Sequence, residues 1–315
     1  MIVKVLNLSY LEIDESFLNI FKENLKRFFP QEENKKESYV LFILKGDKGK
    51  VIFYKTKKVL FELKDEKIFE KILENLKDLL IPDYYKKYDY AIGADEAGKG
   101  DTFGGLVVAC AALNKDIFLS FLSLSISDSK LLKKKNIFEI LKKIKYINFP
   151  YKIKYLNPFL YNSFFEKQKN SLIILDNLYK SLFMDFFEKY KKLFESKKVL
   201  VTLDAYKPPK KLKEIFMPFF EKIEKKYKIN ITFRAIPKAE KYLEVALASV
   251  LAKGAFLVEI EKLKKEFKLS FLPLGSSHKK IKEILSSFEK DKLKYIAKLH
   301  FSNVSKFLTD KKIGI

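Results

Sequence analysis

The chain is poor in the residues that build disulfide frameworks, zinc sites and catalytic triads, with one cysteine and two histidines in 315 residues. A single cysteine excludes a disulfide framework and is typical of a reducing compartment, and its apolar neighbours predict a core position for Cys110. The isolated histidines, His278 and His300, exclude a His/Cys zinc site and form no triad with an obvious serine. We expect His300 to be a packed, hydrogen-bonded residue.

Long apolar runs and a signal-peptide layout are also missing. No stretch of the sequence approaches the roughly 18 apolar residues that a membrane-spanning helix needs. The N-terminus lacks the successive charged, apolar and small-residue regions of a signal peptide. These absences predict a soluble, cytoplasmic protein with no membrane contact.

Positive charge and apolar residues are abundant. The chain carries 63 Lys and Arg against 40 Asp and Glu, a formal charge of +23, and 48% of its residues are hydrophobic, 30 of them Phe. Such a charge attracts polyanions, so nucleic acid is the first partner to consider. A lysine-rich composition that merely solvates the surface is the alternative. The apolar content can fill one large core or two ordinary ones.

Residues 1–82 form a self-contained pattern. Helical spacing of apolar residues predicts helices over 15–29 and 66–80. Three short strands are predicted between them, at 39–44, 50–55 and 58–63. The second helix can cover one face of this small sheet, which leaves the other face free. Pro82 interrupts the periodicity, so we place a domain boundary there.

Residues 83–315 predict a larger α/β domain. Its strands are expected at 90–95, 106–113, 198–204 and 230–235. Long helical patterns, at 170–194 and 209–226, separate the later strands. This order predicts a mixed sheet with helices on both faces.

The segment from Gly93 to Asp101 allows two interpretations. The first is a phosphate-binding loop of the form G-x-x-x-x-G-K-[ST], but Gly100 stands where the hydroxyl residue should be, and two carboxylates lie inside the loop, where they would repel phosphate. The second makes Asp95 and Glu96 oxygen ligands of a hard divalent cation. As a bare pair they would be an ordinary surface turn, so the wider context decides.

Adjacent residues on a regular strand point to opposite faces of the sheet. We therefore expect the strand to lose its pleat near Asp95 and Glu96 so that both can serve one site. Gly98 and Gly100, just downstream, provide such a break and let backbone approach a ligand closely.

The string from Gly93 to Gly105 closely resembles the opening motif of the type 2 ribonucleases H. Three further matches to that family follow along the chain: Asp128-Ser129-Lys130, a strand that ends in Asp204, and Pro237-Lys238-Ala239-Glu240 before a helix of small residues. The Glu at position 240 and the segments 272–275 and 297–303 resemble the ribonuclease HIII branch. Residues 1–82 resemble its N-terminal substrate-binding domain, which implies a small α+β, TBP-like fold beside a ribonuclease H-like domain over 83–315.

The resemblance implies an endoribonuclease that cuts the RNA strand of RNA–DNA hybrids and leaves 5′-phosphate and 3′-hydroxyl ends. Two Mg²⁺ or Mn²⁺ ions about 4 Å apart can activate the attacking water and stabilise the leaving oxygen. The implied catalytic and metal-binding residues are Asp95, Glu96, Asp204 and Glu240. Glu244, one helical turn after Glu240, is the alternative fourth carboxylate.

The resemblance also implies the substrate contacts. The backbone of Gly98, Lys99 and Gly100 would read the ribose 2′-hydroxyl, which distinguishes RNA from DNA. Ser129 and Lys130 would contact phosphates, although Asp128 to Lys130 also reads as a helix N-cap. On the free face of the N-terminal sheet, Tyr54 and Lys58 are candidates for holding the hybrid.

Some positions depart from the family pattern. Thr102 and Gly105 replace an expected Tyr and Pro, and the sequence Asp204-Ala205-Tyr206 differs from the usual family motif. These differences put the local fit of the substrate in question. A non-catalytic nucleic-acid-binding protein and a P-loop nucleotide hydrolase remain as alternative functions. We expect a monomer, and no protein partner is implied.

Overall fold

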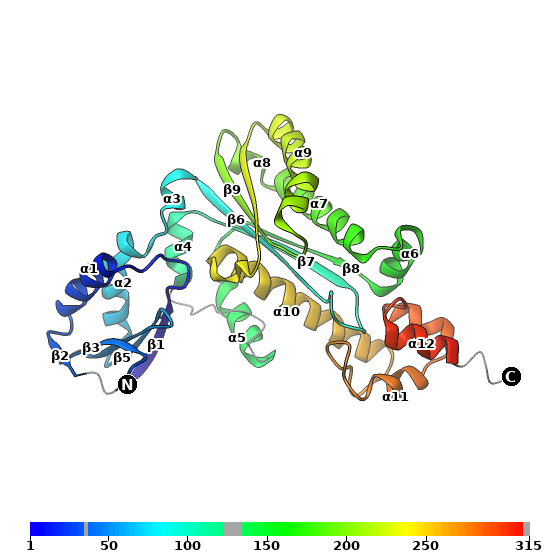
Figure 1. Cartoon of the computed structure of the whole chain (residues 1–315), viewed down its shortest axis with the longest axis horizontal. Coiled ribbons are helices and arrows are strands. Elements are labelled where there is room, and N and C mark those ends of the chain that lie inside the picture. Colours follow the sequence, from blue (N-terminus) through cyan, green and yellow to red (C-terminus); the bar gives the residue numbers. More distant parts are fainter. Residues whose placement is uncertain (35–36, 123–133, 311–315) are drawn as a thin grey trace.

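The computed structural model describes residues 1–34, 37–122 and 134–310, and the chain forms two sheets joined by a short linker (Figure 1). The predicted phosphate contacts Ser129 and Lys130 lie outside the described residues.

The N-terminal sheet has five antiparallel strands in the order β1-β5-β4-β3-β2. They are β1 (Ile2–Asn7), β2 (Gln31–Glu33), β3 (Val40–Gly46), β4 (Gly49–Tyr54) and β5 (Lys58–Leu63). Two helices, α1 (Glu15–Lys26) and α2 (Glu66–Leu80), accompany them, each capped at its N-terminus by an aspartate side chain. The sequence had indicated three of the five strands; β1 and β2 are edge strands with weak apolar alternation.

One face of this sheet is buried and the other is partly open, as the alternation predicted. Phe53 and Phe61 have no exposed surface, and their rings contact Phe21 of α1 and Phe69 of α2. The residues between them along the strands, such as Ile52 and Leu60, remain partly exposed. Both helices therefore cover the same face.

The second sheet is mixed, with the order β10-β9-β6-β7-β8. Its strands are β6 (Tyr90–Ala97), β7 (Leu106–Leu113), β8 (Tyr151–Leu156), β9 (Lys198–Asp204) and β10 (Asn230–Ile236). Parallel pairs join β6 to β9 and β9 to β10, and antiparallel pairs join β6 to β7 and β7 to β8. The predicted mixed sheet is confirmed. β8 was missed, and β6 runs two residues beyond its predicted end.

Helices cover both faces of the mixed sheet (Figure 1). The long α10 (Leu243–Glu266) crosses one face, and α7 (Ser171–Lys189) and α9 (Pro209–Tyr227) pack on the other. The close approach of α10 requires a glycine, because a Cβ on Gly93 would lie 2.2 Å from the backbone carbon of Glu244. The remaining helices are α3 (Tyr84–Lys87), α4 (Lys115–Leu122), α5 (Lys134–Ile144), α6 (Pro158–Gln168), α8 (Lys191–Phe194), α11 (Ile281–Ser286), α12 (Ser302–Asp310) and the 3₁₀ turns η2 (Ala239–Lys241) and η3 (Lys290–Tyr295).

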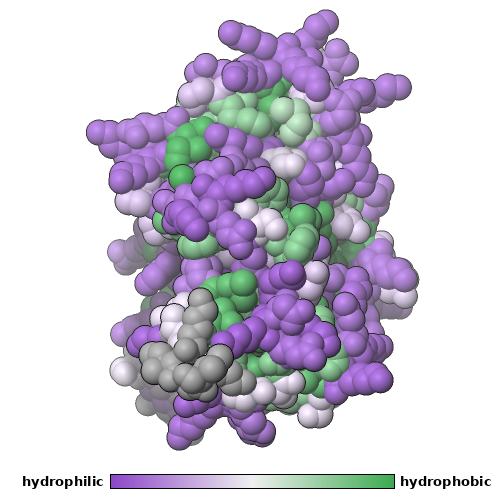
Figure 2. Space-filling view, turned by 90° about the vertical axis from the view of Figure 1, so that its right-hand side faces the viewer, coloured by the Kyte–Doolittle hydropathy of each residue, from purple (hydrophilic) through white to green (hydrophobic). Residues whose placement is uncertain are grey.

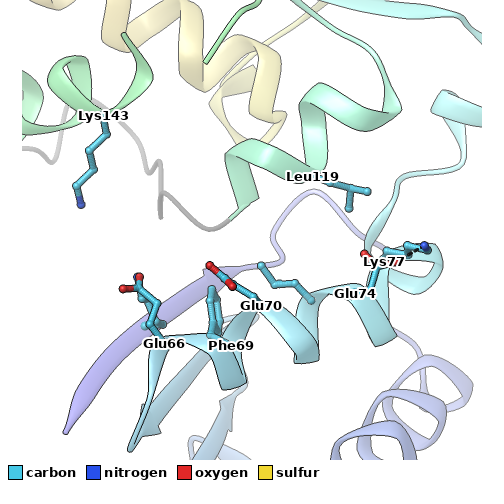
Figure 3. Close-up of a pocket in the computed structure, with 9 residues that line it drawn as sticks. Glu66, Phe69, Glu70, Glu74, Lys77, Leu119 and Lys143 are labelled. Atoms are coloured by element: carbon cyan, nitrogen blue, oxygen red, sulfur yellow. Dashed lines mark hydrogen bonds and ion pairs between the residues drawn. The ribbon is translucent and has the colours of Figure 1, made fainter. Parts of the chain in front are cut away.

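Aromatic side chains connect the N-terminal part of the chain to the domain of the mixed sheet. The rings of Tyr10 and Tyr85 both contact Phe118 of α4, at centroid distances of 5.5 and 5.0 Å. Beside this contact a groove of about 390 Å³ separates α2 from α4 and α5, and Figure 3 shows Glu66 and Glu70 on one side with Lys143 across from them. Because the groove mixes acidic and basic side chains, it does not suit a polyanion.

The surface is largely hydrophilic. Figure 2 shows the side of the molecule that carries α11 and α12, where apolar side chains are scattered among hydrophilic ones. Within the described ranges, no helix combines the length and apolarity needed to cross a membrane.

Candidate active site

Asp95 and Asp204 lie side by side at one end of the mixed sheet. The parallel pairing of β6 with β9 runs as far as Ala94 opposite Leu203, so the next residue on each strand is one of these aspartates. Residues alternate between faces along a strand, and Leu203 packs in the core beneath α7. Both aspartates therefore point to the α10 face.

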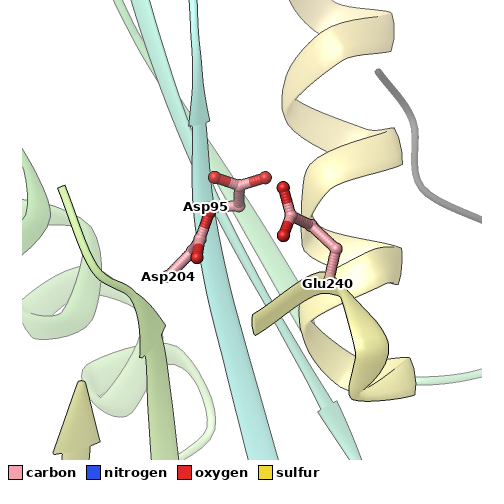
Figure 4. Close-up of side chains that lie close together, drawn as sticks. All are labelled: Asp95, Asp204 and Glu240. Atoms are coloured by element: carbon pink, nitrogen blue, oxygen red, sulfur yellow. The ribbon is translucent and has the colours of Figure 1, made fainter. Parts of the chain in front are cut away.

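Glu240 joins them from the turn after β10. Lys238 adopts a left-handed conformation with φ of 55°, which turns the chain into η2. The N–H of Ala239 then donates to Oδ1 of Asp204 at 2.9 Å and ties the turn to the strand end. One oxygen of each of the three carboxylates lies within 4.8 Å of the others, and Figure 4 shows them facing a common space.

This donor set fits a hard divalent cation. All three ligand atoms are carboxylate oxygens, which Mg²⁺ and Mn²⁺ prefer. Asp95 is 3% exposed, and its Oδ2 has no hydrogen-bond partner among the described residues. Burial, and then the nearby charge of Glu96, raise the pKa of Asp95 well above its ordinary value. A bound cation would supply the missing partner and offset this repulsion.

Glu96 lies on the other face of the sheet. β6 stays regular through this point, with Glu96 opposite Val108 and Ala97 opposite Val107, so the expected break in the pleat is absent there. The two oxygens of Glu96 accept hydrogen bonds from the Tyr179 hydroxyl at 2.8 Å and the Lys99 ammonium at 3.3 Å. Glu96 is thus outside the three-carboxylate cluster, beside it rather than in it.

Glu244 has a different environment from Glu240. It is fully buried at the start of α10, where it accepts hydrogen bonds from the hydroxyls of Tyr84 at 3.0 Å and Tyr85 at 3.4 Å. An Arg234 nitrogen lies 4.0 Å from its other oxygen. Between the two candidates for the fourth carboxylate, the geometry favours Glu240. The helix of small residues, α10, begins at Leu243, so Glu240 lies before it, in the separate turn η2.

The glycine-rich loop after β6 has an exposed tip on a buried base. Gly98 has φ of +90°, and a Cβ there would lie 2.6 Å from the Gly105 carbonyl oxygen. Lys99 and Gly100 are exposed, and nothing lies within 4 Å of where a Gly100 Cβ would be. Of the three predicted RNA-reading residues, Lys99 and Gly100 are therefore accessible, whereas Gly98 is buried.

Tyr206 supports this loop, a role that the sequence did not predict, although Asp204-Ala205-Tyr206 stood out as a departure from the family pattern. Its ring stacks on Tyr179 at 5.5 Å and lies 5.5 Å beneath the Lys99 ammonium. Its hydroxyl donates to Asp176 at 2.6 Å, and Asp176 also pairs with Lys207. The unusual residues after Asp204 thus form an aromatic platform under Lys99.

Two further residues near the site, Ser249 and Lys298, were not predicted from the sequence. Ser249, in the helix of small residues, hydrogen-bonds the Asp95 carboxylate; its position on the buried face of that helix was the available signal. Cys110 is fully buried, as predicted. His300 stacks on Phe165 at 4.0 Å, which confirms the packing, but its Nδ1 has no hydrogen-bond partner among the described residues. Lys298 is the second missed residue.

A ribonuclease H-like mixed sheet with carboxylates at the end of its central strands defines a class of metal-dependent nucleases, and sequence comparison narrows that class. Residues 92–304 match the family model of ribonuclease HII. The ribonuclease HIII of Ureaplasma parvum is 33% identical over 232 residues, 72% of this chain and 70% of that protein. The ribonuclease HIII of Phytoplasma mali is 33% identical over 294 residues, 92% and 94% of the two chains. The chain therefore belongs to the type 2 ribonuclease H family, in its ribonuclease HIII branch.

Solved structures agree with this assignment. Bst-RNase HIII in complex with Mn²⁺ matches with a TM-score of 0.61 at 23% identity over 99% of each chain, which shows a shared fold. Aquifex aeolicus RNase H3 matches with a TM-score of 0.52 at 27% identity over 95% of this chain and all of that one. The enzyme is a ribonuclease H, and the P-loop and non-catalytic alternatives are set aside.

Proposed function

We propose that the cluster of Asp95, Asp204 and Glu240 is the centre at which this endoribonuclease cuts the RNA strand of RNA–DNA hybrids. The observation that carries the assignment is the buried, unpartnered Oδ2 of Asp95 within a set of three converging carboxylates. These residues would hold the divalent cations, Mg²⁺ or Mn²⁺, on which the enzyme depends. When bound, such ions lower the pKa of water and stabilise a leaving oxygen.

The residues around the cluster have complementary roles in the proposal. Asp95 and Asp204 lie on neighbouring strands and would hold the cations, while Glu240 completes the set from η2. The positive charge of these ions would attract the scissile phosphate. Glu96 is held by Tyr179 on the far side of the strand, from which it contributes negative charge at the edge of the centre. Water attacks phosphorus and the bond to the 3′ oxygen breaks, which leaves 5′-phosphate and 3′-hydroxyl ends.

The exposed loop tip gives the reaction its RNA specificity in this proposal. The N–H groups of Lys99 and Gly100 have no acceptor among the described residues, so they are free to meet a ribose 2′-hydroxyl. The Lys99 ammonium, held over Tyr206 near Glu96, adds positive charge beside the phosphate. Ser129 and Lys130, outside the described residues, stay predicted phosphate contacts.

A cleavage assay tests the function directly. Labelled RNA–DNA hybrid, double-stranded RNA and double-stranded DNA are incubated with the protein in Mg²⁺, Mn²⁺ or EDTA. We expect cleavage confined to the RNA strand of the hybrid and abolished by EDTA. Cleavage of double-stranded DNA, or cleavage that persists in EDTA, would contradict the proposal.

We propose that residues 1–82 form a substrate-binding domain beside a catalytic domain over 83–315. The register of β4 and β5 continues from Phe53 opposite Val59 to bring Tyr54 and Lys58 next to each other on the partly open face. An aromatic ring beside a lysine suits a nucleic-acid backbone. The TBP-like character of this sheet stays a prediction.

Substitutions on the intact chain test this binding face. Lys58→Ala should weaken hybrid binding a few-fold and lower the salt dependence of binding by about one ion, with kcat unchanged. Lys71→Ala on α2, an exposed lysine on the covered side, is the matched control. Equal losses in both variants would argue for a general charge effect instead.

We also propose that the protein acts as a monomer in the cytoplasm. Its thiol is buried, in keeping with a reducing compartment. Sedimentation of the purified chain tests the first statement, and a second copy at working concentration would contradict it.

A further inference from the structure

Lys298 is unusual among the basic residues of this chain because it is completely buried. Of the lysines and arginines in the described ranges, it is the one that is buried, with no exposed surface. Burying an ammonium costs several kcal/mol unless hydrogen bonds replace its water. Lys298 must therefore make good hydrogen bonds, and the acceptors of these bonds indicate its role.

The partners of Lys298 are backbone carbonyls of the glycine loop. Its Nζ donates to the carbonyl oxygens of Asp101 at 2.7 Å and Gly104 at 2.9 Å. The rings of Tyr161 and Phe301 enclose the remaining side, each with its centroid 5.6 Å from Nζ. Among the described residues no carboxylate lies within ion-pair distance of it, and the nearby Asp101 carboxylate instead accepts from the Gly275 N–H at 2.6 Å.

The backbone around Lys298 holds the same loop. The Lys298 N–H donates to the Thr102 carbonyl at 2.9 Å, and the Gly104 N–H donates to the Ile296 carbonyl at 2.8 Å. Phe103 and Ala297 form an antiparallel bridge between these two bonds. The C-terminal segment thus pairs with the loop base as a short strand would.

Two asparagines brace this contact from either side. Asn162 of α6 donates to the Lys294 and Ala297 carbonyls and accepts from the Leu299 N–H, which fixes the segment that carries Lys298. Asn303 of α12 donates to the Thr102 hydroxyl at 2.8 Å. Thr102, one of the departures from the family pattern, therefore has a specific partner in this chain.

The loop is consequently rigid where it meets the C-terminal segment and open where it meets substrate. Residues 101–105 are buried and bonded, while Lys99 and Gly100 are exposed. Carbonyls drawn inward by an ammonium fix the orientation of the peptide groups on either side of the turn. Recognition of a single hydroxyl requires placement to within about 0.5 Å, so the orientation of this base controls how the tip meets the ribose.

We propose that Lys298 is a positioning residue for RNA recognition: its buried ammonium holds the base of the glycine loop so that Lys99 and Gly100 meet the ribose 2′-hydroxyl. This inference rests on the proposed function and deepens it. It assigns specificity to a residue of the C-terminal segment, far in sequence from the loop it serves. A lysine is needed because its single nitrogen supplies two donors at once from within an aromatic enclosure.

Lys298→Met tests the inference, since methionine keeps much of the side-chain volume and removes the donors. Two substrates are compared: a hybrid with ribose throughout the cleavage region and the same hybrid with one 2′-deoxy substitution at the cleaved position. We expect kcat on the ribose substrate to fall about 10- to 100-fold with KM little changed, because misplacement by about 1 Å has this effect. The preference for ribose over deoxyribose should fall with it, while Mn²⁺ affinity stays within about two-fold.

Ile223→Ala is the control, because Ile223 is buried in the core on the α7 face, away from the loop. It should lower stability without changing the ribose preference. Lys298→Met with an unchanged ribose preference, or Ile223→Ala with the same loss, would overturn the positioning role and leave only a structural one.

Thr102→Val keeps the test decisive if Lys298→Met fails to fold. It removes the hydroxyl that Asn303 holds and retains the side-chain shape, so we expect a smaller fall in the ribose preference. An unchanged preference in Thr102→Val would then count against the inference. If the wild-type enzyme cuts no hybrid at all, the proposed function itself fails; if it cuts and both variants match its preference, only the role of Lys298 fails.

Discussion

The end of strand β6 presents two unlike regions on its two faces. On the α10 face, Asp95 is buried beside Asp204 and has an oxygen without a partner. On the α7 face, both oxygens of Glu96 are occupied, one by Tyr179 and one by Lys99. Adjacent carboxylates of one strand therefore differ in whether both of their oxygens have hydrogen-bond partners among the described residues.

The difference shows how one strand can supply two functions. A buried carboxylate oxygen without a partner, such as Asp95 Oδ2 among the described residues, is costly, and the cations proposed for the α10 face would offset that cost. On the α7 face, each oxygen of Glu96 already accepts a hydrogen bond, and these bonds hold Glu96 in place beside Lys99. At this edge of the sheet, the substrate phosphate would meet the proposed cation-binding carboxylates on the α10 face and the hydrogen-bonded Glu96 and Lys99 on the α7 face.

The largest difference between the two faces is expected when a carboxylate of the α10 face loses its charge. Asp95→Asn or Asp204→Asn removes a proposed cation ligand without changing the shape of the side chain, and we expect kcat to fall about 10³-fold or more, equivalent to about 4 kcal/mol. Cleavage of labelled hybrid at saturating Mg²⁺ measures the loss. Asp78→Asn, an exposed aspartate of α2 that pairs with Lys115, is the matched control and should keep full activity. Near-normal turnover in either active-site variant would show that the cations lie elsewhere.

A second comparison within the α10 face separates Glu240 from Glu244. Glu240→Gln should lower kcat about 10²-fold and leave the melting temperature nearly unchanged. Glu244→Gln loses a fully buried charge near Arg234 and should destabilise the fold by about 2 kcal/mol while its Mg²⁺ dependence persists. Parallel activity and thermal unfolding measurements distinguish them. If Glu244→Gln instead loses activity at unchanged stability, Glu244 is the fourth ligand.

Strand positions and the carboxylates on them could be predicted from sequence because both follow local patterns. β7 and β9 have the predicted bounds, and the motif around Asp95 is contiguous. The edge strands β1 and β8 were missed because an edge position tolerates weak apolar alternation. The bounds of a strand can thus be predicted from the sequence where at least one face of the strand is strongly buried.

Contacts between distant segments could not be predicted. Tyr179 meets Glu96 only because α7 packs across the sheet, and no spacing in the sequence indicates it. The regularity of β6 was also misjudged, since glycines at Gly98 and Gly100 suggested an earlier end to the pleat. Lys298 is the extreme case, because a lysine in a buried segment is hard to tell from a surface lysine until its partners are seen.

The α7 face can be tested by removing one hydroxyl. Tyr179→Phe leaves the ring stacked against Tyr206 but frees an oxygen of Glu96, and we expect activity to fall about 10-fold, as for other residues that orient ligands. Tyr227→Phe is the control, because its hydroxyl serves Glu188 on the far side of the fold. Initial rates on hybrid across a Mg²⁺ series measure the change. A loss as large as that of Asp95→Asn would erase the distinction between the two faces.

The smallest expected effect is on stability and depends on pH. Burial raises the pKa of both Asp95 and Glu96, so in EDTA the folded protein holds protons that the unfolded chain has released. Stability should therefore fall as pH rises above the ordinary Asp value of 3.8, over the range in which the folded carboxyls still bind protons. Melting temperatures between about pH 5 and about pH 8 should show Asp95→Asn flattening this fall by a few degrees. Glu96→Gln should flatten it less, because Lys99 and Tyr179 already favour the Glu96 charge. The reverse ranking would place the greater electrostatic strain on the α7 face.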